Sequence, residues 1–131
     1  MVIRTLVLIS LASVAFLAFA QVDLPPKMQG KWTSQKVAGG DATIELVKME
    51  GAETARVKVR MTGVVNHYLV PCDSGTVETV AMKAGDSWQI AVPSVRCASY
   101  SITLKPIESK QRFEGVYTTD IGGPGTIFLE W

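Results

Sequence analysis

The clearest pattern along the chain is an alternation of apolar and polar side chains in TARVKVRM, residues 54–61. Ala55, Val57, Val59 and Met61 fall on one side of an extended chain, and the polar residues between them fall on the other. An α-helix would scatter these apolar residues around its circumference. The pattern therefore predicts a half-buried antiparallel strand.

Runs with the same period of two recur through most of the chain, and each predicts a short strand. They are separated by turn residues such as Gly39-Gly40-Asp41 and Gly85-Asp86. The predicted strands are KWTSQKV (31–37), TIELVKM (43–49), VVNHYLV (64–70), TVETVAM (76–82), SWQIAV (87–92), SYSITL (99–104), RFEGVYTT (112–119) and TIFLEW (126–131).

Many short strands with a turn signal about every 8–12 residues are typical of an all-β sandwich or barrel. We predict a single small antiparallel barrel of about eight strands over residues 30–131, because closure removes exposed sheet edges. A flattened β-sandwich is the alternative.

The chain begins with an apolar segment, MVIRTLVLISLASVAFLAFA, in which Arg4 is the only charge. The small residues of Ala18-Phe19-Ala20 provide a cleavage site, so residues 1–20 are predicted to be a cleaved signal peptide. A membrane anchor is the competing interpretation, but the apolar run is short for a spanning helix. Residues 21–29 are predicted to form an N-terminal leader, because Pro25-Pro26 cannot join a helix or a central strand. The predicted location is periplasmic or secreted.

Two cysteines, Cys72 and Cys97, follow the predicted signal. An even cysteine count in an exported protein favours a disulfide. The alternative is a pair of free buried thiols.

Charge is balanced, since residues 21–131 hold equal numbers of basic and acidic side chains without a run of either sign. A nucleic-acid partner would require a basic stripe, so none is expected. No membrane insertion is expected after signal cleavage. The sequence leaves the oligomeric state undetermined.

The stretch HYLVPCDSG, residues 67–75, contains the residue types of a serine hydrolase. His67 is the only histidine, so any histidine-based catalysis at Ser74 would have to use it. Seven residues separate the two, which is more than 20 Å along a strand at about 3.3 Å per residue. We therefore expect no enzyme and no catalytic residue, with a His67/Ser74 hydrolase as the alternative. Without a ligand cluster we expect no metal and no cofactor.

Aromatic residues are the remaining candidates for function. Trp32, Trp88 and Trp131 lie in predicted strands, where they would most often fill the core of a small barrel. The functional alternative is a stacking platform at the barrel mouth, for which Tyr68, Trp88 and Tyr117 are the candidate ligand contacts.

Gly30-Lys31-Trp32-Thr33 resembles the first strand of the calycins, the lipocalin and avidin superfamily. The resemblance implies a small β-barrel in which Trp32 is structural. Residues 113–119, FEGVYTT, are similar to an avidin strand in which the tyrosine and a threonine lie near the ligand. That strand comes some 80 residues too late in this chain.

Two functions follow as hypotheses. The first is a non-enzymatic binding protein of the bacterial cell envelope, holding a small apolar or aromatic ligand in the barrel or on an open sheet face. The second is an inhibitor or immunity-type module that binds a protein partner through exposed loops.

Overall fold

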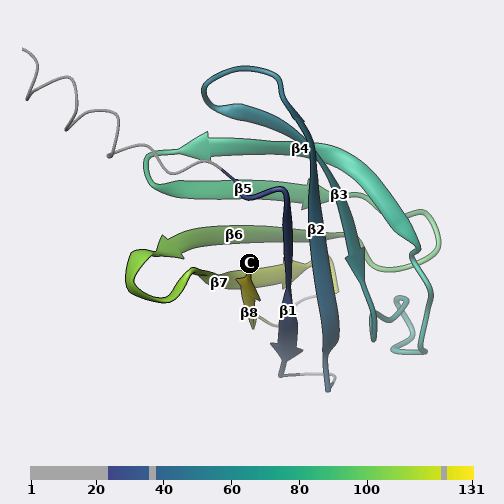
Figure 1. Ribbon diagram of the computed structural model, residues 1–131. Helices are drawn as coiled ribbons and strands as arrows, with labels where there is room; N and C mark the ends of the chain where they lie inside the picture. The colour runs from purple at the N-terminus through teal and green to yellow at the C-terminus, as the bar shows by residue number, and fades with distance from the viewer. Residues whose placement is uncertain (1–23, 36–37, 122–123) are drawn as a thin grey trace, which may run out of the picture.

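A computed structural model of the chain describes residues 24–35, 38–121 and 124–131. The predicted signal peptide, residues 1–20, lies outside the described residues. Within the described residues, no helix is long and apolar enough to cross a membrane. The strands labelled in Figure 1 are β1 (Lys27–Ser34), β2 (Gly40–Met49), β3 (Thr54–Met61), β4 (Thr76–Ala84), β5 (Ser87–Val92), β6 (Tyr100–Ile107), β7 (Arg112–Thr119) and β8 (Gly125–Glu130). A short 3₁₀ turn, η1 (Glu108–Lys110), lies between β6 and β7.

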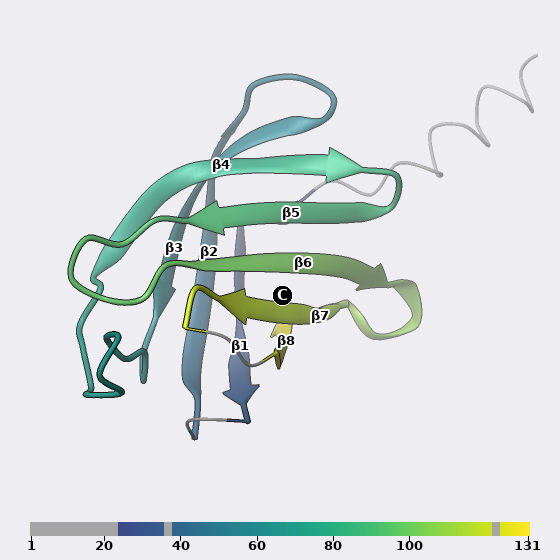
Figure 2. The ribbon, with the colours of Figure 1, turned by 180° about the vertical axis from the view of Figure 1, so that it is seen from behind.

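These eight strands form a closed antiparallel barrel in sequence order, which confirms the predicted fold. Closure comes from β1 and β8, where Gly30 pairs with Leu129 and Trp32 with Ile127. β4 is strongly curved, and β1–β3 run steeply across β5–β7 (Figure 1, Figure 2). The barrel therefore has no free edge strand at the β1–β8 seam.

Inward-facing side chains from all eight strands fill the interior. In β3, every second residue from Ala55 to Met61 is buried, as the alternation predicts. The largest side chains exposed by less than 2% include Trp32, Trp88 and Phe113. Trp32 is also fixed by its indole Nε1, which donates to the Thr62 carbonyl oxygen at 2.8 Å. Trp32 and Trp88 therefore belong to the core.

One predicted strand is wrong. Residues 64–70 form a loop, with a single isolated bridge between Val65 and Pro71. The side chain of Asn66 binds backbone amides within this segment, and such local bonds compete with a sheet ladder. Nearer the N-terminus, β1 begins at Lys27, so residues 27–29 of the predicted leader lie in the sheet.

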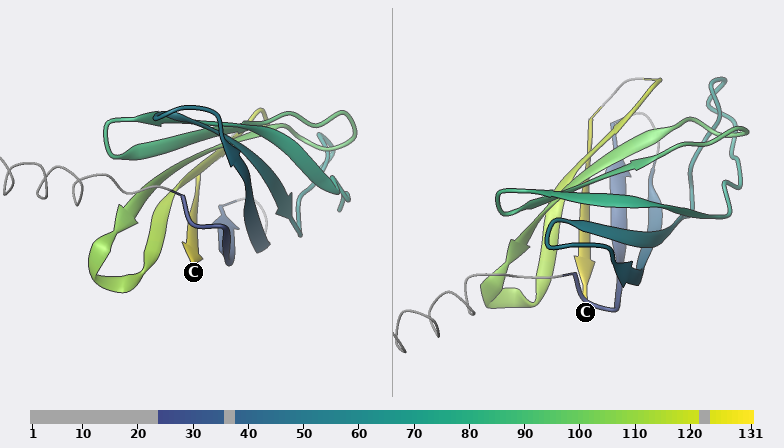
Figure 3. Two further views of the ribbon diagram at one scale, coloured as in Figure 1. Left: turned by 45° about the horizontal axis from the view of Figure 1, so that its top comes forward. Right: turned by 90° about the horizontal axis from the view of Figure 1, so that it is seen from above.

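The barrel has two distinct ends. At one end lie the short turns β2–β3, β4–β5 and β6–β7 together with the C-terminus. Loop 62–75 lies at the opposite end, as both views of Figure 3 show. The β5–β6 connection, residues 93–99, lies at the same end, as does Asp120, which follows β7. The candidate site is built from these loops.

Candidate functional site

Loops 62–75 and 93–99 are joined by the disulfide between Cys72 and Cys97, which confirms the predicted pairing. The two Cα atoms are 5.8 Å apart, an ordinary separation for a cystine. We call these two segments the linked loops. A disulfide of this kind belongs to an oxidising, non-cytoplasmic compartment.

Backbone hydrogen bonds reinforce the disulfide on both sides. The Cys72 amide donates to the Val64 carbonyl oxygen at 2.9 Å, and the Ala98 amide donates to the Val65 carbonyl oxygen at 3.0 Å. Val64, Cys97 and Ala98 are buried at 2%, 1% and 4% exposure. The linked loops are therefore anchored to the core at their base.

The outer part of loop 62–75, residues 66–70, is a compact turn that we call the tip. Asn66 Oδ1 accepts bonds from the backbone amides of Tyr68 at 2.9 Å and Val70 at 3.2 Å. The Asn66 amide also donates to the Val70 carbonyl oxygen at 3.0 Å. Leu69 closes the turn in the left-handed region, with φ of 61°. This conformation costs a residue with a Cβ about 1–2 kcal/mol.

The linked loops expose large apolar side chains. Tyr68 is 87% exposed, Leu69 50% and Val70 52%, and Val95 on the other loop is fully exposed. An exposed apolar cluster on a monomer often marks an interaction site. The tip therefore combines a hydrogen-bonded backbone with apolar side chains that are at least half exposed.

A histidine–carboxylate contact connects the tip to the end of β7. His67 Nε2 lies 3.0 Å from Asp120 Oδ2, although 53 residues separate the two in sequence. Ser74 does not complete a hydrolase arrangement, because its Oγ is buried and has no hydrogen-bond partner among the described residues. Among the described residues, the geometry thus shows a histidine–carboxylate contact without a nucleophile bonded to the histidine. That the chain is not an enzyme stays a prediction.

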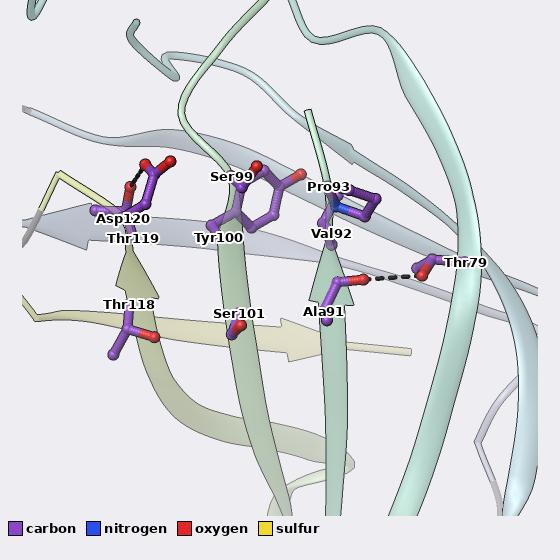
Figure 4. Close-up of a pocket in the computed structure, with 10 residues that line it drawn as sticks. All are labelled: Thr79, Ala91, Val92, Pro93, Ser99, Tyr100, Ser101, Thr118, Thr119 and Asp120. Atoms are coloured by element: carbon purple, nitrogen blue, oxygen red, sulfur yellow. Dashed lines mark hydrogen bonds between the residues drawn. The ribbon is translucent and has the colours of Figure 1, made fainter. Parts of the chain in front are cut away.

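An open groove of about 670 Å³ lies beside the linked loops, on the outer side of β5–β7. This volume falls within the roughly 300–1,000 Å³ of small-molecule sites. Figure 4 shows the side chains that line the groove. They are Thr79, Ala91, Val92, Pro93, Ser99, Tyr100, Ser101, Thr118, Thr119 and Asp120.

Three aromatic rings pack beneath this end of the barrel. Tyr117 contacts Trp32 and Tyr100, with ring centroids 4.9 Å and 5.6 Å apart. Burial raises the pKa of the Tyr100 hydroxyl, and the neighbouring Tyr117 adds to the rise. Ser74 opposes this rise in the Tyr100 pKa. The Ser74 and Tyr100 hydroxyls do not lie in hydrogen-bond geometry, and each is unpartnered among the described residues. Burial also raises the pKa of Tyr117.

The three predicted ligand contacts do not come together. Tyr68 projects from the tip, Tyr117 is 5% exposed within the aromatic cluster, and Trp88 is 1% exposed in the core. A ligand site on these three residues stays a prediction. The turn-forming role of Asn66 was not predicted from the sequence. The contact of Asp120 with His67 and that of Tyr100 with Tyr117 were not predicted either, because they join residues far apart in the chain.

No protein-family model matches the chain, and no curated protein sequence matches it. Among solved structures, it is similar to a redesigned β-barrel, with a TM-score of 0.56 and 15% sequence identity. The similarity covers 82% of this chain and 90% of that one. At this identity the comparison supports the fold alone: a small eight-stranded antiparallel β-barrel.

Proposed function

We propose that this protein is an exported, non-enzymatic binding module that docks the tip of its linked loops into an apolar cleft of a partner protein. The observation that carries the proposal is Leu69, a large apolar residue held at φ 61° and half exposed. Glycine or asparagine is the usual residue at such a position. Backbone strain that persists without an evident gain in packing is a reason to look for function.

Preorganisation supports the same proposal. Binding costs free energy when a flexible loop must become ordered, and that cost falls when the bound conformation already exists. Here the disulfide, the Asn66 turn and the contact of His67 with Asp120 hold the tip before any partner arrives. Tyr68 offers a large amphipathic surface of a kind that is enriched in binding hot spots.

The test is affinity capture from envelope extract with the tagged mature protein and two matched variants. Val70→Asp places a charge on the tip, where Val70 is 52% exposed. Val116→Asp makes the same change on the outer face of β7, where Val116 is 51% exposed. We expect one stoichiometric partner with the wild type and Val116→Asp, and its loss with Val70→Asp. Equal capture by all three proteins would refute the role of the tip.

The first hypothesis, a small apolar or aromatic ligand, has weaker support from the geometry. Buried side chains fill the interior, and two of its three candidate contacts, Trp88 and Tyr117, are among them. Native mass spectrometry of freshly purified protein tests it directly, since a retained small molecule would favour this hypothesis over loop docking.

The proposal also includes export of the protein and its relationship to a known family. The disulfide and the apolar N-terminal segment together support export to the periplasm or beyond. The Gly30-Lys31-Trp32 motif, with its tryptophan in the core, supports a relationship to the calycins. Mass spectrometry of the protein from its native cells tests the first point, because export predicts a mature N-terminus at Gln21.

A further inference from the structure

The outer groove arises where the sheet separates between β4 and β5. β4 pairs with β3 from Thr76 to Met82, but its pairing with β5 begins only at Ala81. Between Thr76 and Val80, β4 thus has no ladder to β5. The Thr79 hydroxyl spans the separation and donates to the Ala91 carbonyl oxygen at 2.8 Å. Backbone polar groups at such a separation are available to a ligand.

Tyr100 lines the groove and carries a buried hydroxyl. Tyr100 is 4% exposed, and its hydroxyl has no hydrogen-bond partner among the described residues. In Figure 4 this hydroxyl is directed from β6 toward Pro93 at the end of β5. Ser74 Oγ is likewise buried and unpartnered among the described residues. Each of the two hydroxyls can both donate and accept, so one bond between them would leave part of this capacity unused. Leaving such groups unsatisfied is costly, which favours a ligand that both donates and accepts.

Hydroxyls and a carboxylate occupy the open side. Ser101 and Thr118 are paired neighbours on β6 and β7, and both are exposed. Among the described residues that line the groove, Asp120 is the only charged one, so an anion would meet repulsion there without a compensating cation from these residues. The carboxylate oxygens of Asp120 are already engaged, one with His67 and one with the Thr119 hydroxyl. This engagement lowers the gain from binding a cation and leaves lone pairs for neutral hydroxyls.

We propose that the groove is a binding site for a neutral polyhydroxylated molecule, such as a monosaccharide unit of a glycan. Hydroxyls of the ligand would exchange hydrogen bonds with Tyr100, Thr118 and Asp120, while its C–H face lies on Ala91 and Pro93. This site is separate from the apolar tip and does not depend on the proposed partner protein.

The test is a titration of the ¹⁵N-labelled mature protein, followed by backbone amide shifts. Glucose, galactose and N-acetylglucosamine are the neutral probes, choline is the cationic probe and sulfate the anionic one. We expect saturable shifts at residues 99–101 and 118–120 with at least one sugar at millimolar concentration, and none with choline or sulfate. Saturable groove shifts with choline or sulfate alone, or with no probe, would overturn the proposal.

Variants localise the contact. Thr118→Val and Tyr100→Phe each remove one hydroxyl, and each should weaken sugar binding about 3- to 10-fold, the effect of one neutral hydrogen bond. Thr103→Val is the control matched to Thr118→Val, because it makes the same change on the neighbouring strand β6 at a residue that does not line the groove. Val70→Asp should leave the sugar titration unchanged, which separates this site from the proposed tip. Weakening by Thr103→Val equal to that by Thr118→Val, or none by Thr118→Val, would overturn the assignment.

Discussion

Removal of the disulfide is the perturbation that bears most on the linked loops. Cys72 and Cys97 close a loop with a sequence separation of 25. In the chain-entropy description, releasing this constraint from the unfolded chain costs about 3.5 kcal/mol of stability. Small domains have a total stability of about 5–15 kcal/mol, so the loss is a large fraction of it. The double variant Cys72→Ala/Cys97→Ala avoids placing a serine hydroxyl at Cys97, which is 1% exposed.

Urea unfolding of the wild type and the double variant measures this loss, and amide hydrogen exchange locates it. We expect the free energy of unfolding to fall by about 3–4 kcal/mol. Protection should fall most at the Cys72 and Ala98 amides, which donate to loop carbonyls at 2.9 Å and 3.0 Å. A loss below about 1 kcal/mol, with both amides still protected, would refute the claim that the disulfide holds the linked loops in place.

Three further predictions concern the barrel. Tyr100→Phe should lose less than about 0.5 kcal/mol in urea unfolding, because the hydroxyl that it removes has no partner; a loss above about 1.5 kcal/mol would instead show a strong bond at this position. Burial raises the pKa of Tyr100 and Tyr117 from the ordinary 10.0, so the stability that both contribute is complete below pH 10.0 and is lost as pH rises through their folded-state pKa values. Ultraviolet titration should show that the phenolates of these two tyrosines form together with unfolding. Ready ionisation of all tyrosines in the folded protein would contradict this. Gly30→Ala would place a Cβ 1.7 Å from the Phe128 carbonyl oxygen and should cost about 3 kcal/mol or more in thermal unfolding, whereas the control Gly51→Ala, with nothing within 4 Å of its Cβ, should be close to neutral.

Much of the sheet could be predicted from period-two patterning. The predicted strands at 54–61, 87–92 and 112–119 coincide with β3, β5 and β7. Here alternation and burial agree, because one face of each strand packs against a filled interior. The disulfide was also predictable, since two cysteines in a chain that is predicted to be exported allow a single intramolecular pairing.

The site was less predictable because its contacts cross the sequence. The run at 64–70 is rich in β-branched and aromatic residues, which favours a strand, but Asn66 binds its own loop and the segment forms a single bridge, between Val65 and Pro71. The contact of His67 with Asp120 joins residues 53 positions apart. No local pattern encodes such a pair, and none encodes the groove, which depends on where the β4–β5 ladder begins.

The central claim is that the tip is ordered before it meets a partner. Backbone ¹⁵N relaxation of the oxidised mature protein measures this directly at residues 66–70. We predict order parameters close to the value of about 0.85 seen for rigid backbone. Values below about 0.6 at Tyr68 and Leu69 would show a flexible segment and would contradict a preorganised binding loop.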